Sequence, residues 1–356
     1  MVLSVQWLRG IAACAVVLRH AVTGAEKAGW LAPNGLDIGL WGVDLFFVIS
    51  GFIMAITTAG QTPGINAALA FWRRRIVRVV PIYWLLTTLV VVMSLLAPAT
   101  TGYRPSPDHV LASYLFIPMA DDRGVMSPPL RVGWSLNFEM YFYLVFGWLL
   151  LLPRRWLAPM LIGWTTISVL LGQWLAPQAA LPSMLTSTYL CEFTCGVGIG
   201  LLHQHGIALP RPAAIVLTLA GFFGAIAGDV LGIGHDLLPR ILPAVGMLYG
   251  LLSIEKGAGA GWFNFQRRAA LALGDWSYGL YLTHILTLAA LTAVFNKIGA
   301  ARLVPGPWLF MFGVLTAIGV SAAVYRFVEQ PLQRLTSHRT KRFDSRLRSS
   351  ASRARP

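Results

Sequence analysis

The chain has 356 residues, of which 56% are hydrophobic and only 12% are charged, and its mean hydropathy is +0.65. A soluble domain carries about 25% charged residues. A chain this apolar could not cover its surface in water, whereas a lipid bilayer requires such a surface. The composition therefore excludes a soluble globular protein and predicts an integral membrane protein.

The formal net charge of +14 is concentrated near the C-terminus, where Arg334 to Arg355 hold eight basic residues and one acid, Asp344. A tail rich in serine and arginine after the last apolar run is typical of a disordered segment beside anionic headgroups. We therefore expect membrane lipids, and not nucleic acid, as partners of this tail. The predicted division is a transmembrane domain at 1–332 and a basic cytoplasmic tail at 333–356.

Ten apolar runs, separated by proline, glycine and charged residues, are each about 17–25 residues long, which is enough to cross a bilayer. The sequence therefore predicts an all-α, polytopic membrane protein with about ten transmembrane helices. The expected helices occupy residues 3–22, 38–59, 76–97, 134–152, 157–174, 184–202, 212–229, 237–253, 271–295 and 307–328.

The distribution of lysine and arginine predicts the orientation of these helices. With a cytoplasmic N-terminus, the inside segments hold eighteen basic residues and the outside segments hold seven, Arg240 among them. Because basic residues favour the cytoplasmic side, both termini are expected there. The longest outside segment, 98–133, is the expected place for a lid or an acceptor-binding surface.

Two ionisable residues stand inside the first apolar run. Arg9 and His20 are eleven residues apart, which places them within about 20° on one helix face and about 16 Å apart along the axis. Intramembrane charges usually mark function, and this pair describes a site open to the cytoplasm, with Ala13 and Val16 leaving space for a slender ligand. Alternatively, Arg9 reaches the headgroups and His20 is satisfied at the outer interface.

Three acids also fall within apolar runs: Asp44, Glu139 and Glu192. Asp44 is a candidate to orient an imidazole, although it could merely sit at the outer interface. Glu139 shares a helix face with Ser135 and needs a partner, for which Arg9, Arg75 and His20 are candidates. For Glu192, structural pairing is as good an interpretation as chemistry.

An arginine cluster precedes the third helix, in the segment Arg73-Arg74-Arg75-Ile-Val-Arg78, and Pro81 and Tyr83 follow it. The guanidinium fork matches the oxygens of phosphate groups. Positive-inside topology would account for one or two of these arginines. Four of them predict a phosphate-binding mouth on the cytoplasmic side.

His284 lies well inside the ninth apolar run and is a second candidate for chemistry. The remaining histidines are expected to be surface residues in loops, namely His109, His203, His205, His235 and His338. The three cysteines form no disulfide framework, and although Cys191 and Cys195 share a helix face, apolar packing is the simpler interpretation. No metal site is predicted.

Six segments together resemble the acyltransferase 3 family of membrane acyltransferases, which includes sugar O-acetyltransferases of exopolysaccharide, lipopolysaccharide and nodulation-factor pathways. Each pattern is weak alone, but their order along nearly the whole chain is specific. The segments are Arg9 with ten residues before His20, Gly42-Val-Asp-Leu-Phe-Phe-Val-Ile-Ser-Gly-Phe52, Arg75-Ile-Val-Arg78 with Pro81, Trp134-Ser-Leu-Asn-Phe-Glu139, Ser277-Tyr278 with Tyr281-Leu282-Thr283-His284, and Glu329-Gln-Pro331.

The resemblance implies about ten transmembrane helices in a bacterial inner membrane, an acyl-CoA co-substrate, most simply acetyl-CoA, and a carbohydrate or glycolipid hydroxyl as acceptor. No permanently bound cofactor is implied. By position, Arg9 and His20 match the family's catalytic pair, and Arg75 and Arg78 match its cytoplasmic arginine motif. We expect no extracytoplasmic hydrolase-like domain of the kind that some members carry, and we therefore expect the chain to be more similar to the compact exopolysaccharide and nodulation-factor enzymes.

These observations predict an enzyme that transfers an acyl group from acyl-CoA to a carbohydrate hydroxyl. His20 would act as general base or be acylated first, and direct transfer is preferred. The candidate catalytic residues are His20, Arg9, Glu139, Asp44 and His284. The candidate donor-binding residues are Arg74, Arg75, Arg78, Ser135 and Tyr83.

The main alternative is a secondary transporter or a flippase of a glycolipid or small solute, which would favour paired broken helices and inverted repeats. The sequence shows neither. A lipid-linked glycosyltransferase or a non-catalytic sensor is a further alternative, and an acyl-CoA turnover assay distinguishes all three from the predicted enzyme.

Overall fold

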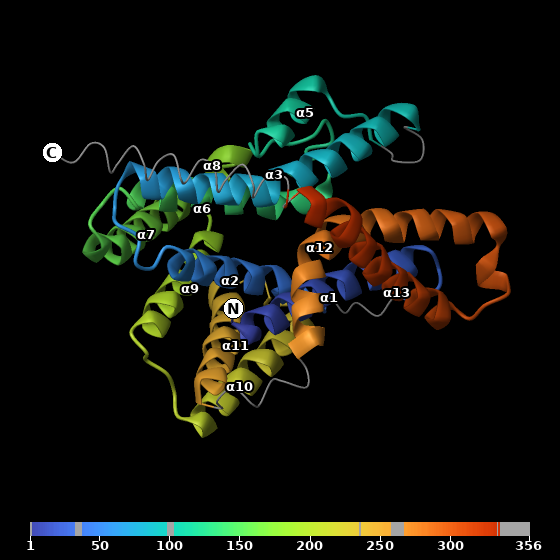
Figure 1. Cartoon of the computed structure of the whole chain (residues 1–356). Helices are drawn as coiled ribbons and strands as arrows, with labels where there is room; N and C mark the ends of the chain where they lie inside the picture. The colour runs from blue at the N-terminus through green and yellow to red at the C-terminus, as the bar shows by residue number, and fades with distance from the viewer. Residues whose placement is uncertain are drawn as a thin grey trace. The chain divides into compact units, whose positions relative to one another are not determined.

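The computed structural model describes residues 2–32, 38–97, 103–234, 236–257, 267–332 and 334 (Figure 1). Within these ranges the chain forms helices, turns and bends, and no strand. The predicted basic tail lies outside the described residues, apart from Arg334. His235 and His338 also lie outside them.

Twelve α-helices occur in the described ranges. They are α1 (Leu3–Lys27), α2 (Trp41–Thr57), α3 (Ile65–Leu96), α5 (Pro107–Tyr114), α6 (Trp134–Leu149), α7 (Leu157–Leu175), α8 (Ala180–Leu185), α9 (Tyr189–Gln204), α10 (Arg211–Val230), α11 (Leu237–Gly257), α12 (Arg267–Ile298) and α13 (Gly306–Val324). Short 3-10 turns occupy Arg131–Gly133, Arg154–Trp156 and Ala300–Arg302, and a π-helical turn occupies Tyr325–Glu329.

The all-α, polytopic membrane fold is confirmed. Eight helical segments of the described chain are long and apolar enough to cross a membrane, as judged by their length and composition. A helix lies at each of the ten predicted positions, but α2, α6 and α9 have only 17, 16 and 16 residues, and α9 reaches a spanning length only together with α8. The count of ten crossings and the cytoplasmic placement of both termini therefore stay predictions.

The third helix is longer than predicted. It begins at Ile65 and not near residue 76, so that the arginine cluster lies within it and not before it. Its first turns are rich in alanine and arginine, which both favour a helix, and the arginines are costly in the hydrocarbon core. An apolar-run search detects only the part of a helix that suits lipid, which explains the error.

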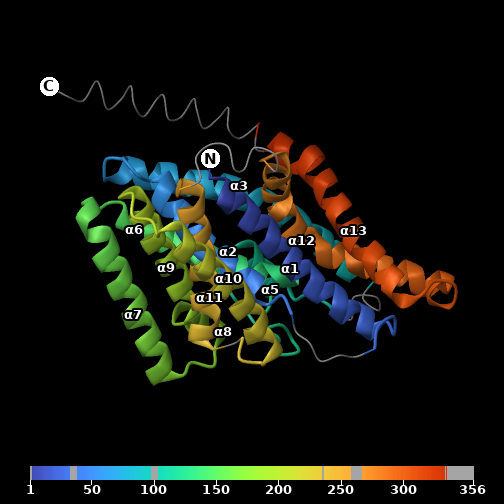
Figure 2. The ribbon, with the colours of Figure 1, turned by 90° about the horizontal axis from the view of Figure 1, so that it is seen from below.

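The chain divides into two compact units, and each is described by itself. Unit 1 comprises Met1–Thr57 and Cys191–Tyr325, and unit 2 comprises Thr58–Leu190 and Arg326–Pro356. In unit 1, α10 packs along α11, and α1 packs along α12 and against α2 (Figure 2).

Glycine allows the helices of unit 1 to approach closely. A Cβ on Gly42 would lie 2.5 Å from the carbonyl oxygen of Ala12, and a Cβ on Gly51 would lie 2.0 Å from that of Phe193. Such contacts are typical of membrane helix pairs, in which small residues let the backbones touch. The positions of α1 and α9 against α2 are thereby fixed by the backbones themselves.

The start of α1 is held by a carboxylate from α11. Glu255 accepts hydrogen bonds from the backbone amides of Leu3 and Ser4, both at 2.9 Å, and from the Ser4 hydroxyl at 2.6 Å. A helix N-terminus has unpaired amides and a partial positive charge, and a carboxylate satisfies both. Glu255 thus fixes the beginning of the helix that carries Arg9 and His20.

In unit 2, α3 and α6 pack in opposite directions. Trp72 lies against Gly147, and its indole nitrogen donates to the carbonyl of Tyr143 at 2.9 Å. At the other end of the pair, the ring of Tyr83 lies against Gly133, where a Cβ would come within 2.6 Å of it. The two contacts set the register of α3 on α6.

The segment before α6 carries an ordered polar cluster, and it corrects one prediction. His109 is buried in α5 and is not a surface residue: its Nδ1 bonds to the Tyr103 hydroxyl, and its Nε2 lies 3.1 Å from the carbonyl oxygen of Ser127. Arg123 lies over the Tyr103 ring, 4.9 Å from its centre, and donates two hydrogen bonds to Asp121. Local hydrogen bonding thus orders the described part of this segment, and its role as a lid or an acceptor-binding surface stays a prediction.

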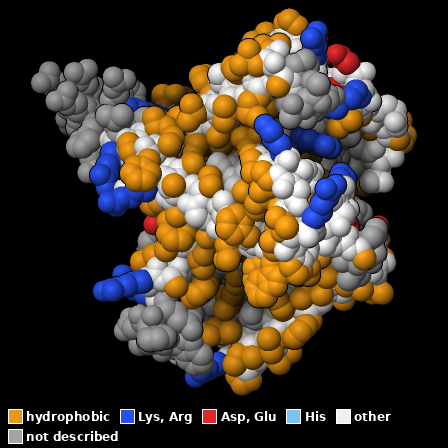
Figure 3. Space-filling view, turned by 90° about the vertical axis from the view of Figure 1, so that its right-hand side faces the viewer, with side chains coloured by type: hydrophobic (Ala, Val, Ile, Leu, Met, Phe, Trp, Pro, Cys, Tyr) orange, Lys and Arg blue, Asp and Glu red, His pale blue; other side chains and the backbone are white. Residues whose placement is uncertain are grey.

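The surface agrees with a membrane environment. Hydrophobic side chains cover much of the face shown in Figure 3, and lysine and arginine gather in separate groups on it. Large apolar side chains stand exposed on several helices, for example Trp174 on α7 and Leu96 on α3. In water such exposure would be costly, but in lipid it is favourable.

Candidate active site

The structure brings two predicted histidines together in unit 1. The rings of His20 on α1 and His284 on α12 have centroids 5.2 Å apart and are inclined by 36°. His284 is fully buried, and its Nδ1 lies 2.9 Å from the carbonyl oxygen of Leu280. Because a carbonyl only accepts, Nδ1 carries the hydrogen and Nε2 presents its lone pair. Among the described residues, no group donates a hydrogen bond to that Nε2.

Close packing between α1 and α12 creates this pair. Gly10 lies against Leu273, and Gln6 lies against Gly274. Both contacts come earlier along α1 and α12 than the contact of the two histidines. The contact passes from Gly10 beside Leu273 to His20 beside His284, so the two helices run in the same direction. His284 stands 264 positions after His20 in the sequence, and no spacing rule relates them.

Arg9 is half-buried and has a neighbour that the sequence did not indicate. Its Nη1 donates to the side-chain oxygen of Gln6 at 3.3 Å. Gln6 is itself buried and is pressed against the backbone of Gly274. Gln6 therefore helps to position the guanidinium group of Arg9.

The stripe between Arg9 and His20 is packed and not open. Ala13 is fully buried and belongs to a cluster with Leu280 and Ala317. Val16 is buried against Gly42, which comes close enough that a Cβ there would lie 2.8 Å from the Val16 side chain. The prediction that these two residues leave space for a slender ligand is therefore wrong for this conformation.

Asp44 has charged neighbours of its own within unit 1. It is buried on α2, where it interacts electrostatically with Glu192 of α9, Arg240 of α11 and Asp229 of α10. Arg240 and Glu192 form an ion pair with 3.7 Å between Nη2 and Oε1. Arg240 is therefore a buried partner of intramembrane acids and not a residue of an outside loop. Its ion pair with Glu192 agrees with the structural pairing that the sequence allows for that acid. The orienting role of Asp44 stays a prediction.

In unit 2, Arg75 is held between two aromatic rings. Its guanidinium carbon lies 5.4 Å from the ring centre of Phe71 and 5.2 Å from that of Tyr143. The Tyr143 hydroxyl bonds to the carboxylate of Glu139, which lies within electrostatic range of Arg75. Glu139 and Arg75 were considered as partners from the sequence, and the link between them runs through Tyr143, which sequence analysis missed.

Arg74 and Arg78 are half-buried neighbours of Arg75 on α3. Tyr83 and Ser135 occupy the other end of the α3–α6 pair. The Tyr83 hydroxyl bonds to Ser113 at 2.8 Å, and the Ser135 hydroxyl donates to the carbonyl of Val132 at 3.2 Å. Eight residues of helix, about 12 Å, separate Tyr83 from Arg75. The donor-binding role of Tyr83 and Ser135 stays a prediction.

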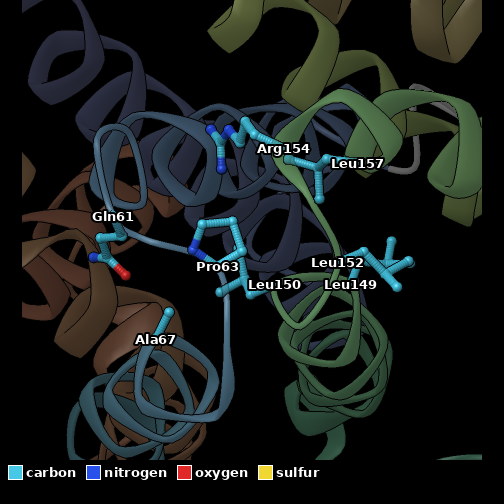
Figure 4. A pocket seen from close by; sticks show the side chains of 8 residues that line it. All are labelled: Gln61, Pro63, Ala67, Leu149, Leu150, Leu152, Arg154 and Leu157. Carbon is cyan, nitrogen blue, oxygen red and sulfur yellow. The ribbon is translucent and has the colours of Figure 1, made fainter. Parts of the chain in front are cut away.

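Unit 2 also carries a shallow pocket, shown in Figure 4, where α2 leads into α3 and α6 leads into α7. Its lining includes Arg154, Gln61 and a group of leucines. Arg154 donates to the Thr58 hydroxyl at 3.2 Å, which ties the pocket wall to the start of the unit. None of the predicted site residues lines this pocket.

Comparison with known proteins agrees with the resemblance noted in the sequence. Residues 2–326 match a family described as an acyltransferase domain, Acyl_transf_3. The chain belongs to the acyltransferase 3 family. It is therefore a membrane acyltransferase, and this membership favours the predicted enzyme over the transporter, flippase and glycosyltransferase alternatives.

Several curated relatives cover almost the whole acyltransferase 3 domain. The exopolysaccharide production protein ExoZ of Rhizobium meliloti is 34% identical over 325 residues, which are 89% of this chain and 95% of that protein. Nodulation protein 10 of Rhizobium leguminosarum is 25% identical over 92% of each chain. The peptidoglycan O-acetyltransferase OatA of Listeria monocytogenes is 23% identical over 93% of this chain, but only 56% of that protein is covered. No solved structure matches.

The acyltransferase 3 segments thus fall into two sets of contacts. In unit 1 the structure joins His20 with His284 and places Arg9 beside Gln6, whereas Asp44 belongs to a separate group of charges. In unit 2 it joins Arg75 with Glu139 through Tyr143. The roles of these residues in acyl transfer are proposals.

Proposed function

We propose that this protein transfers an acetyl group from cytoplasmic acetyl-CoA to a hydroxyl group of a carbohydrate, in the plasma membrane of a bacterium. The observation that carries the proposal is the His20–His284 pair within an acyltransferase 3 domain. The names of the relatives support a carbohydrate acceptor, because they concern exopolysaccharide production and peptidoglycan O-acetylation. An exopolysaccharide, or a lipid-linked precursor of one, is the preferred acceptor.

His20 is proposed to act as the general base. It removes the proton from the acceptor hydroxyl, the hydroxyl oxygen attacks the thioester carbonyl carbon, and the carbon–sulfur bond breaks. The proton on His20 then passes to the sulfur, so that the products are an O-acetyl ester and coenzyme A. Proton transfer by a positioned imidazole contributes about 10²–10⁴-fold to a rate.

His284 is proposed to support this chemistry by staying neutral beside His20. Its Nδ1 hydrogen is committed to Leu280, which fixes the ring and its tautomer. Two imidazolium groups 5.2 Å apart in a medium of low dielectric would repel each other strongly. The pair therefore carries at most one positive charge, and the additional proton that gives this charge is the one taken from the acceptor.

The arginines are proposed to bind the donor. Each unit offers guanidinium groups that suit the phosphates of coenzyme A: Arg9 in unit 1, and the α3 cluster of Arg74, Arg75 and Arg78 in unit 2. Arg75 is the most buried of the cluster, and two aromatic rings lie against its guanidinium group, one of them in the Tyr143–Glu139 pair. Phosphate binding of this kind weakens with added salt, so the donor KM should rise with ionic strength.

The test is acetyl transfer by purified protein in lipid nanodiscs with radiolabelled acetyl-CoA. His20→Ala should insert and fold normally yet lose activity by about 100-fold or more. His284→Ala should lower kcat by a smaller factor and leave the donor KM unchanged. His205→Ala, an exposed histidine after α9, is the matched control and should behave as the wild type. Wild-type turnover by His20→Ala would remove His20 from the mechanism.

The acceptor is tested separately by mass analysis of surface glycans from a strain that lacks the gene. We expect the loss of one acetyl group per modified sugar, restored by the wild-type gene and not by the His20→Ala gene. Unchanged glycans together with normal acetyl-CoA turnover would refute the carbohydrate acceptor and retain the enzyme.

A further inference from the structure

A group of four buried charged residues lies in unit 1, and the proposed reaction makes no use of it. Asp44, Glu192, Asp229 and Arg240 come from α2, α9, α10 and α11. All four are buried, with exposed fractions of 4%, 0%, 6% and 5%. Three carboxyl groups thus surround one guanidinium group inside an apolar bundle, where unbalanced charge is costly.

The contact between α2 and α9 forces two of these acids together. A Cβ on Gly196 would lie 2.0 Å from the carbonyl oxygen of Val48, and a Cβ on Gly200 would lie 2.5 Å from the Cβ of Ala55, so the helices touch and run in the same direction. Asp44 and Glu192 each stand four residues, one helical turn, before Val48 and Gly196. Their carboxyl groups are therefore neighbours, and the backbones leave no freedom to separate them.

Charge balance then decides how many protons the pair can lose. Arg240 forms its ion pair with Glu192 at 3.7 Å, and it also faces Asp44. Asp229, which also interacts electrostatically with Asp44, accepts hydrogen bonds at its Oδ2 from the amides of Gly39 at 2.6 Å and Leu40 at 3.1 Å, just before α2 begins. It adds negative charge, so one cation cannot compensate two further charged carboxyl groups that lie side by side.

In the part of unit 1 that the structure describes, the titratable groups next to the pair supply no second cation. Cys191 and Cys195 of α9 are neighbours of Glu192, and neither carries a positive charge. On α1, Arg19 lies beside Gly39, ahead of the first turn of α2. Within the described residues, neither oxygen of Glu192 accepts a conventional hydrogen bond, so the carboxyl group has room for a bound hydrogen.

We propose that Asp44 and Glu192 together bind one proton, so that the pair carries a single negative charge opposite Arg240. It is a proton-binding site within the helical bundle, distinct from the histidine pair. Loss of this proton would set two like charges side by side at the α2–α9 contact, which glycine backbones hold closed. The stability of unit 1 is thereby linked to pH, and the inference stands independently of the proposed acyl transfer.

Infrared spectroscopy of the full-length protein in nanodiscs tests the proposal directly. A buried protonated carboxyl group gives a carboxylic-acid C=O band that shifts in D₂O. Asp44→Asn and Glu192→Gln should each abolish the same band, because either change leaves one carboxylate that Arg240 alone neutralises. Asp122→Asn, an exposed acid in unit 2, should leave the band intact. A band that survives in either pair variant would overturn the shared proton.

The pH dependence of unfolding gives a second test. The folded pair holds one proton, whereas carboxyl groups that unfolding exposes to water lose their protons at about pH 4, so stability should fall as the pH rises above that value. Asp44→Asn and Glu192→Gln should flatten this dependence relative to Asp122→Asn, and equal slopes in all proteins would refute the proposal. If a variant fails to fold, the wild-type protein is labelled with ¹³C in its aspartate and glutamate carboxyl groups. The carboxylic-acid band should then shift with the labels, and the absence of such a band would refute the site.

Discussion

The substitution Gly274→Ala should disturb catalysis from a position that touches no substrate. A Cβ at residue 274 would lie 1.9 Å from the side-chain oxygen of Gln6 and 2.8 Å from its Cβ and Cδ. An ordinary contact needs about 3.5 Å, so the Gln6 amide must move by about 1.5 Å. That amide accepts the hydrogen bond of Arg9 at 3.3 Å, and a shift of this size breaks it.

The size of the effect follows from the bond that is lost. A hydrogen bond to a charged group contributes about 1.5–3 kcal/mol. Because Arg9 is half-buried, we take the lower end, which corresponds to about a 10-fold fall in kcat/KM. Overpacking adds about 1–3 kcal/mol of destabilisation. The assay is acetyl transfer over a range of donor concentrations, combined with thermal unfolding in the same nanodiscs.

Two variants make this prediction specific. Gly319→Ala on α13 is the matched control, because no atom lies within 4 Å of the new methyl group, and it should keep wild-type kinetics. Gln6→Ala removes two of the three clashing atoms, so its effect and that of Gly274→Ala should not add. Wild-type kcat/KM in a folded Gly274→Ala protein would refute the positioning of Arg9 by Gln6.

Two further predictions concern unit 2. Arg75→Lys keeps the charge but loses the planar group between Phe71 and Tyr143, so the donor KM should rise by about 10-fold while Arg73→Lys leaves it unchanged; equal KM values in both variants would contradict the assigned role. Burial alone would raise the pKa of Asp121, but the hydrogen bonds from the Arg123 side chain and from two backbone amides lower it overall. The stabilisation is therefore present above the ordinary value of 3.8 and is lost as the pH falls below it. Pepsin should cut this segment faster in Asp121→Asn than in wild type at mildly acidic pH, with the difference vanishing at lower pH, and identical cleavage throughout would contradict the assignment.

The helices were predictable because the bilayer selects apolar runs of a given length. Their ends were less predictable: α1 continues to Lys27 and α3 begins at Ile65, since helices extend into water on residues that hydropathy does not recognise. The inward face of α1 was also predictable, because Arg9 and His20 repeat at helical spacing. Contacts between helices that are distant in the sequence were not predictable.

Three residues show which contacts could not be predicted from the sequence: His284, Gln6 and Arg240. His284 was a candidate on its own, but nothing in the spacing of residues related it to His20, because the contact depends on how α1 packs along α12. The sequence did not predict a role for Gln6, because a single amide near the start of a helix follows no recognisable pattern. Its contact with Gly274 is visible only in the structure. Arg240 was assigned to a loop, because a lone arginine beside an apolar run is the usual sign of a boundary.

The bond from Glu255 to the first turn of α1 has a consequence for the order in which the protein is made. The helix that bears the proposed base is synthesised before α11 and α12, and its leading amides meet their carboxylate only after some 250 further residues have left the ribosome. The helix that it packs along, α12, emerges later still. Until then α1 lies in lipid without Glu255 at its start and without His284 beside His20, so the histidine pair forms only after α12 has been made.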